Sequence, residues 1–215
     1  MTEKPYFEDA DVVIYHGDCR DILPTLGPVD LVLTDPPYGI GWKGHSASTH
    51  EWGGMANDTG DLDLRFILEM PCAVVAFGAN CYPNQLPHRG RWICWDKQTI
   101  DGATDAMLGS PFELAWSNQV SGFDRIIRVL SGGVINADSG KRFHATQKPL
   151  AVFRQIILWY SGDAATILDP FMGSGTTLRA AKDLGRKAIG IEIEERYCEI
   201  AAMRMAQGVM ALEAH

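Results

Sequence analysis

Short apolar runs recur along the chain, and most of them end in a turn residue or an acid. Residues 12–15, 29–33, 72–77 and 164–168 each form such a run. Continuous runs of this length are typical of strands buried on both faces of a sheet. Between them lie stretches with helical spacing, of which residues 150–160 are the clearest. The pattern predicts an α/β fold with a mostly parallel, doubly wound sheet.

Two βαβ units frame the chain. The first joins the strands at 12–15 and 29–33 through a short helix at 19–26. The second runs from the strand at 164–168, through a helix closed by Gly185, to a strand that ends at Glu192. Because the strands of such units run in parallel, the residues that follow them are expected along one edge of the sheet.

The middle of the chain is less regular. A helix is expected at 61–70, and residues 91–96 and 112–117 are expected to form a hairpin-like strand pair. Residues 121–141 are predicted to be irregular. We expect one catalytic domain over residues 1–215, with recognition or lid loops at about 39–60 and 119–142.

Composition narrows the class of protein. The chain has 215 residues, 46% hydrophobic and 21% charged, which suits a globular domain with a sizeable core. No apolar run approaches the length of a membrane span, and the polar first eleven residues do not resemble a signal peptide. The five cysteines are scattered without a C-x-x-C pair, which predicts a reducing, cytoplasmic location and argues against a metal site.

The net charge of −8 weighs mildly against a nucleic-acid partner, but a local basic face is enough for binding. Residues 124–148 contain five basic and two acidic residues, although the whole chain is acidic. We therefore take this segment as the candidate phosphate-binding face. Its candidate DNA-binding residues are Arg125, Arg128, Lys141 and Arg142.

The first candidate site is Asp35-Pro36-Pro37-Tyr38, directly after a predicted strand. The prolines cannot donate ladder hydrogen bonds, so they stop the strand and stiffen the turn. The turn therefore holds a carboxylate, a proline carbonyl and an aromatic ring together at an edge where ligands bind in open α/β sheets. Two acceptors beside a flat ring suit a planar group that carries an NH2, such as a nucleobase.

The second candidate site is the loop Phe171-x-Gly173-x-Gly175, between a strand and a helix, with Glu192 seventeen positions after its last glycine. An acid at about this offset binds ribose hydroxyls in nucleotide-binding folds. The third glycine of the dinucleotide fingerprint is replaced by Leu178, and no P-loop lysine is present. Asp169 would also repel a phosphate. A cationic nucleoside, S-adenosylmethionine, fits better.

Together, the motifs at 35–38 and 169–175 resemble those of amino-group DNA methyltransferases, N6-adenine or N4-cytosine type. The catalytic motif precedes the cosubstrate loop, as in the circularly permuted β group. The segments His144-Ala145-Thr146-Gln147-Lys148-Pro149 and Gly17-Asp18 also resemble parts of that group. The resemblance spans about residues 12–205 and implies a methyltransferase of Rossmann-like fold that uses S-adenosylmethionine and acts on DNA.

The resemblance implies a base flipped from the duplex, with Tyr38 stacked on it. Asp35 and the Pro36 carbonyl would accept hydrogen bonds from its exocyclic amine and direct the nitrogen lone pair to the methyl group. The catalytic residues would be Asp35, Pro36, Pro37 and Tyr38. The cosubstrate residues would be Asp18, Asp169, Phe171, Gly173, Gly175, Glu192, Thr146 and Lys148. Asp18 is expected at the adenine amine, Glu192 at the ribose and Asp169 at the methionine ammonium, with Thr146 and Lys148 near the methionine carboxylate.

The expected activity is methylation of the exocyclic N6 of adenine in DNA, and three alternatives remain open. N4-cytosine methylation uses nearly the same chemistry, although aspartate at position 35 is more typical of adenine enzymes in this family. A methyltransferase acting on RNA or protein is the second alternative, and an inactive DNA-binding or partner subunit is the third. The recognition loops are short for this family, which predicts a short or relaxed target sequence, or a homodimer.

Overall fold

The computed structural model describes residues 4–39, 62–97, 110–129, 131–132, 135–136 and 148–207. Nine strands form one sheet in the order β1-β2-β11-β10-β3-β4-β6-β5-β7. They are β1 (Phe7–Glu8), β2 (Val12–His16), β3 (Leu31–Thr34), β4 (Ala73–Phe77), β5 (Arg91–Asp96), β6 (Phe112–Ser117), β7 (Arg125–Arg128), β10 (Thr166–Asp169) and β11 (Lys187–Glu192). A separate two-stranded ribbon joins β8 (Ser131–Gly132) to β9 (Ile135–Asn136).

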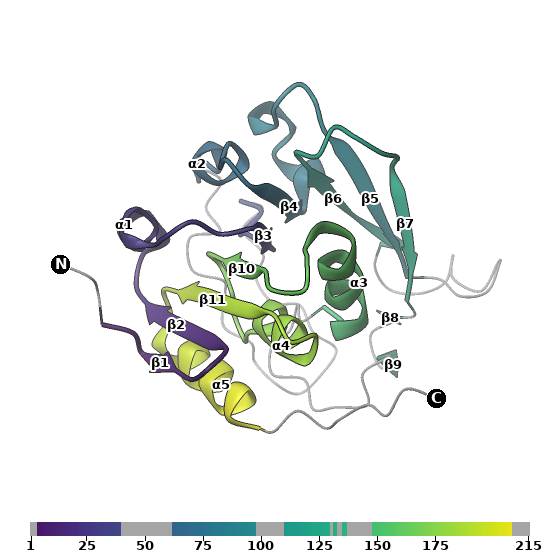
Figure 1. The fold of residues 1–215 in the computed structure, drawn as a ribbon. Helices are drawn as coiled ribbons and strands as arrows, with labels where there is room; N and C mark the ends of the chain where they lie inside the picture. The colour runs from purple at the N-terminus through teal and green to yellow at the C-terminus, as the bar shows by residue number, and fades with distance from the viewer. Residues whose placement is uncertain are drawn as a thin grey trace.

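Helices cover both faces of the sheet (Figure 1). The helices are α1 (Cys19–Ile22), α2 (Arg65–Leu68), α3 (Leu150–Tyr160), α4 (Thr176–Asp183) and α5 (Glu195–Ala206), and short 3₁₀ turns are η1 (Leu23–Thr25), η2 (Ala79–Cys81) and η3 (Pro83–Gln85). Residues of α3, α4 and α5 share a core cluster with Leu31 and Leu33, whereas α1 and α2 pack with Val32 on the other face. The alternation along β3 therefore separates two cores, and the predicted doubly wound α/β fold is confirmed.

The five strands β2, β11, β10, β3 and β4 are parallel, and β6 is antiparallel to its neighbours β4 and β5. The two βαβ units meet at the centre, where β10 pairs with β3 through Ile167–Leu31 and Leu168–Val32. Asp169 ends β10 and Asp35 directly follows β3. Both motifs thus lie at the carboxyl edge of the sheet, as their positions after strands predicted.

Several element boundaries differ from the predictions. Pro24 lies at the start of the 3₁₀ turn η1, so α1 ends four residues earlier than expected. The helix α2 has only four residues. Residues 125–128, expected to be irregular, form the strand β7 because they pair with β5 at the edge of the sheet. The predicted antiparallel pairing of residues 91–96 with 112–117 is confirmed. Within the described residues, no helix is long and apolar enough to cross a membrane.

Candidate active site

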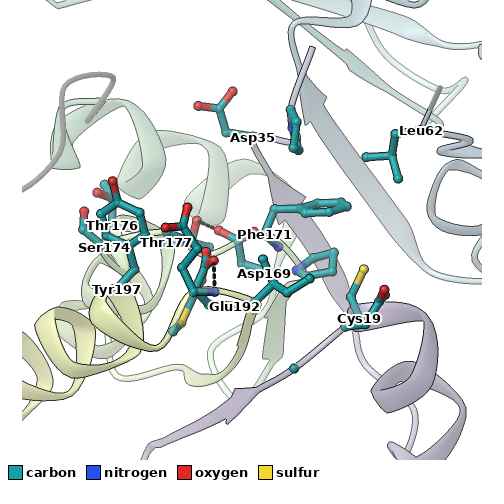
Figure 2. Close-up of a pocket in the computed structure, with 18 of the residues that line it drawn as sticks. Cys19, Asp35, Leu62, Asp169, Phe171, Ser174, Thr176, Thr177, Glu192 and Tyr197 are labelled. Atoms are coloured by element: carbon teal, nitrogen blue, oxygen red, sulfur yellow. Dashed lines mark hydrogen bonds between the residues drawn. The ribbon is translucent and has the colours of Figure 1, made fainter. Parts of the chain in front are cut away.

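A pocket opens at the carboxyl edge of the sheet and encloses about 1020 Å³ of empty space, part of it open to solvent. The loops after β2, β3, β10 and β11 contribute its walls (Figure 2). Eight of the predicted site residues line it: Asp18, Asp35, Pro37, Lys148, Asp169, Phe171, Gly173 and Glu192. Of the other predicted catalytic and cosubstrate residues, Pro36 and Tyr38 adjoin lining residues, Gly175 lies between the lining residues Ser174 and Thr176, and Thr146 lies outside the described residues. The fold therefore gathers the two sequence motifs around one pocket.

The Asp35 carboxylate accepts two side-chain hydrogen bonds. Tyr38 Oη donates to Asp35 Oδ1 at 2.5 Å, and Lys148 Nζ donates to Asp35 Oδ2. Lys148 Nζ also lies 3.1 Å from Tyr38 Oη. Sequence reasoning assigned Lys148 to the methionine carboxylate and did not anticipate these contacts, because residues 35 and 148 approach only in the folded chain.

The Tyr38 ring packs against Gly78, which directly follows β4. Gly78 has a left-handed φ of +68°, and a Cβ at this position would lie 2.0 Å from Tyr38 Cε1. No side chain larger than hydrogen fits at residue 78 unless the Tyr38 ring moves. Sequence reasoning missed this position, since a lone glycine after a strand is also an ordinary turn residue.

Asp169 is buried, with 3% of its surface exposed, and is held by three donors. Its carboxylate accepts hydrogen bonds from Thr34 Oγ1 at 2.7 Å, Thr177 Oγ1 at 2.5 Å and the Phe171 amide at 3.1 Å. Burial outweighs these hydrogen bonds and raises the pKa of Asp169 to about 7. A cation bound beside Asp169 would therefore stabilise the charged form of its carboxylate.

Glu192 is fixed by the backbone on both sides. Its carboxylate accepts from the Gly173 amide at 3.0 Å and from the Glu194 amide at 2.8 Å. Burial raises the pKa of Glu192 despite these two hydrogen bonds. Each oxygen keeps a further lone pair, so the side chain is oriented to accept hydrogen bonds from hydroxyl groups.

Gly173 and Gly175 shape the loop that carries the second motif. Their φ angles of +49° and +79° are left-handed. A Cβ on Gly175 would lie 3.0 Å from Ala201 Cβ, whereas a Cβ on Gly173 would meet no atom of the described residues within 4 Å. Gly175 thus permits close packing of α4 on α5, while Gly173 brings the backbone up to the pocket.

At the end of β2, Asp18 caps α1 by accepting from the Arg20 amide at 2.9 Å. The Arg20 side chain also pairs with it and lowers the pKa of Asp18. The neighbouring thiol of Cys19 lines the pocket, but burial raises its pKa to about 12. At neutral pH Cys19 is therefore a protonated thiol and not a nucleophile.

These donor and acceptor groups fit S-adenosylmethionine. Asp18, Asp169 and Glu192 supply carboxylates from three different strand ends, which suits a ligand with a cationic end, a ribose and an amine. Phe171 and Pro170 add apolar surface, and Gly173 leaves room beside the backbone. An anionic dinucleotide would meet these same carboxylates, which explains why the pocket does not suit one.

Residues 80–203 match the N6/N4 methyltransferase family model, whose description is "DNA methylase". Type II methyltransferase M2.DpnII of Streptococcus pneumoniae is 50% identical over 255 aligned positions, covering 95% of this chain and 93% of that protein. The chain belongs to the DNA methylase family. Type II methyltransferase M2.LlaDCHI of Lactococcus lactis subsp. cremoris is 28% identical, in an alignment that covers 97% of this chain and 94% of that protein.

Solved structures agree with this methylase in fold. PvuII DNA methyltransferase (cytosine-N4-specific) aligns with a TM-score of 0.68 and 15% identity, over 97% of this chain and 91% of its own. The complex of M1.HpyAVI with S-adenosylmethionine aligns with a TM-score of 0.60 and 23% identity, over 91% of this chain and 100% of its own. This protein is thus an amino-group DNA methyltransferase that uses S-adenosylmethionine.

Two of the predicted DNA-binding residues, Arg125 and Arg128, lie in the described part of the chain, both on β7. Arg125 pairs with Ile93 at the start of β7, whereas Arg128 pairs with Asp96 at its end, on the side of Asp35. Strand alternation also turns them to opposite faces: the Arg125 guanidinium lies over the Trp159 ring at 4.5 Å, while Arg128 is 65% exposed and lies 3.4 Å from Asp96. These two arginines therefore do not lie side by side on β7, and their role in DNA binding stays a prediction. Lys141 and Arg142 lie outside the described residues.

Within the same described part of the methylase, no group of three His, Cys, Asp or Glu side chains is placed to hold a metal ion.

Proposed function

We propose that this methylase transfers a methyl group to the exocyclic N6 of adenine in DNA. The observation that carries the proposal is a carboxylate, Asp35, at the head of the Pro-Pro-Tyr turn, where it lies beside the cosubstrate pocket. Among related motifs, aspartate here is more typical of adenine enzymes and serine of cytosine enzymes. The Type II methyltransferases that the chain resembles support a modification role beside a restriction enzyme.

The chain's own residues position the target. Asp35 and the Pro36 carbonyl accept hydrogen bonds from the exocyclic amine, which draws the nitrogen lone pair out of ring conjugation. The Tyr38 ring stacks on the flipped base, and this supplies part of the energy that unstacking costs. S-adenosylmethionine, held by Asp18, Asp169 and Glu192, supplies an electrophilic methyl group on a sulfonium. Positioning is then the main catalytic contribution, and no covalent enzyme intermediate is required.

The target base is identified by methylating unmodified DNA and analysing its nucleosides by mass spectrometry. N6-methyldeoxyadenosine is the expected product. N4-methylcytosine would establish the alternative, which the PvuII fold keeps open, since that enzyme acts on cytosine N4. Binding of cosubstrate without any transfer would establish the inactive-subunit alternative.

The short recognition loops also favour a homodimer on DNA. Sedimentation of the protein with and without duplex DNA tests this expectation.

Cosubstrate affinity is expected to fall as the pH falls through 7. Because burial raises the pKa of Asp169 to about 7, its neutral acid predominates below that pH and cannot pair with the methionine ammonium. Well below pH 7, the affinity for S-adenosylmethionine should fall by about tenfold per pH unit, and this fall is the acid limb of the affinity profile. Calorimetric titration between pH 5.5 and 8 measures it.

The control for this prediction is Asp169→Asn, which should bind weakly at every pH and show no acid limb. The pKa of Glu192 is raised as well, so Glu192→Gln must retain the limb if Asp169 is its source. An acid limb that persists in Asp169→Asn would contradict the assignment.

DNA affinity is expected to depend on Arg128 and not on Arg125. Arg128 lies at the catalytic edge and is exposed, whereas Arg125 lies toward the other edge and stacks on Trp159. Arg128→Ala should weaken binding to all sequences and reduce the salt slope by about one. Arg125→Ala is the matched control and should leave the slope unchanged. Binding titrations at several salt concentrations measure both, and equal slopes in the two variants would contradict this placement.

A further inference from the structure

Lys148 is the most deeply buried cation at the pocket, with 6% of its side chain exposed. It comes from the segment before α3, on which Phe153 also lines the pocket. Its ammonium is enclosed by the Asp35 carboxylate, the Tyr38 hydroxyl and the Phe77 ring, whose centre lies 5.0 Å away. A lysine so enclosed is placed to act on the catalytic turn itself.

A second carboxylate lies beside the same ammonium. Glu113 Oε2, on β6, is 3.2 Å from Lys148 Nζ, and Glu113 Oε1 pairs with Lys97 at 2.6 Å. Although this Oε2 is buried, no donor within the described part of the chain meets it with hydrogen-bond geometry. Lys148 thus stands between the Asp35 carboxylate, to which it donates a hydrogen bond, and the Glu113 carboxylate, with which it forms an ion pair at 3.2 Å without hydrogen-bond geometry.

Lys148 and Glu113 are both charged. Burial alone would lower the pKa of Lys148, but Asp35, Tyr38 and Glu113 raise it well above its ordinary value, so the ammonium persists. Burial raises the pKa of Glu113, but Lys148 and Lys97 lower it by more. The net lowering keeps the Glu113 carboxylate charged. Removing one partner from such a group leaves the other charge buried and uncompensated.

We propose that Lys148 is a positioning residue for the catalytic turn, which fixes the Asp35 carboxylate in the free enzyme and releases it to the target amine by shifting onto Glu113 Oε2. This inference rests on the proposed function of Asp35. Asp35 has both oxygens engaged before any base arrives, one by Tyr38 and one by Lys148. A base amine needs one of these acceptor positions, and Glu113 is the acceptor that keeps the displaced ammonium paired.

Lys148 would act at two moments, first holding the Asp35 carboxylate in place and then leaving it to the target amine. A fixed carboxylate shortens the search for the geometry of transfer, and misplacement of about 1 Å can cost about 10²-fold in rate. The exchange of partners then keeps the charge of Lys148 compensated throughout. Lys148 would therefore influence the rate of transfer much more than cosubstrate binding.

The test compares Lys148→Met, Lys148→Arg and Glu113→Gln with Lys187→Met, an exposed lysine on β11 as matched control. Measured are kcat with saturating DNA, KM for DNA, and the Kd of S-adenosylmethionine by calorimetry. Lys148→Met should lower kcat by about 10²-fold, with the Kd changed less than about twofold. Lys148→Arg should recover part of this loss, Glu113→Gln should lose about tenfold, and Lys187→Met should match wild type.

Other results would overturn the inference. An unchanged kcat in Lys148→Met would do so, as would a tenfold weaker cosubstrate affinity at normal kcat, which would assign Lys148 to the methionine carboxylate. Unfolding free energies of Lys148→Met, Asp35→Asn and the double variant report folding and the pair directly: additive effects mean that the two side chains do not interact. A wild-type protein that transfers no methyl group to DNA would overturn the proposed function as well, whereas an active wild type beside an equally active Lys148→Met overturns this inference alone.

Discussion

Replacing Asp35 by alanine is expected to lower the rate of methyl transfer by about 10³-fold while cosubstrate affinity stays within about twofold. Asp35 supplies the acceptor that draws the target nitrogen toward the methyl group, and the cosubstrate carboxylates Asp18, Asp169 and Glu192 come from other strand ends. Single-turnover transfer to duplex DNA and calorimetric titration of S-adenosylmethionine measure the two quantities separately.

The matched control for this variant is Asp163→Ala, whose side chain is fully exposed and lies outside the pocket. It should retain wild-type kcat. Because Asp35 is also the partner of buried Lys148, the unfolding free energy of Asp35→Ala should be measured in parallel. Near-normal turnover in a folded Asp35→Ala would refute the catalytic assignment and leave the cosubstrate assignment standing.

The sheet and the position of both motifs could be predicted because the signals are local. An apolar run followed by Asp-Pro marks the end of a buried strand wherever it occurs, and right-handed βαβ connections place such ends on one edge. The observed pairing of β10 with β3 brings the two motifs to one pocket. The same local logic predicted Glu192 and the glycines of the 171–175 loop.

The remaining features depend on partners far away in sequence. The strand β7 exists because residues 125–128 find β5, and this pairing is also what separates Arg125 from Arg128. Seen in sequence, the two arginines form a charge cluster, but the period of two in a strand turns them to opposite faces. In the same way, the bonds of Lys148 to Asp35 and its approach to Glu113 join three segments that no spacing rule connects.

Gly78→Ala is expected to abolish most methyl transfer, by about 10²-fold, although residue 78 carries no chemistry. The added Cβ would lie 2.0 Å from the Tyr38 ring, so the ring must move, and Tyr38 Oη would then lose its hydrogen bond to Asp35. The left-handed φ of +68° adds a backbone cost of about 1–2 kcal/mol. Transfer kinetics and urea unfolding of the variant measure the two effects.

Gly185→Ala separates ring displacement from backbone strain. Gly185 has nearly the same φ, +69°, but a Cβ there would meet none of the atoms in the described part of the chain within 4 Å. The backbone strain should destabilise both variants by a similar amount, yet only Gly78→Ala should lose methyl transfer. Both should bind S-adenosylmethionine normally, because the carboxylates of the pocket are unchanged. Equal activity in the two variants would mean that the position of the Tyr38 ring does not limit transfer, and the stacking role assigned to Tyr38 would then have to be abandoned.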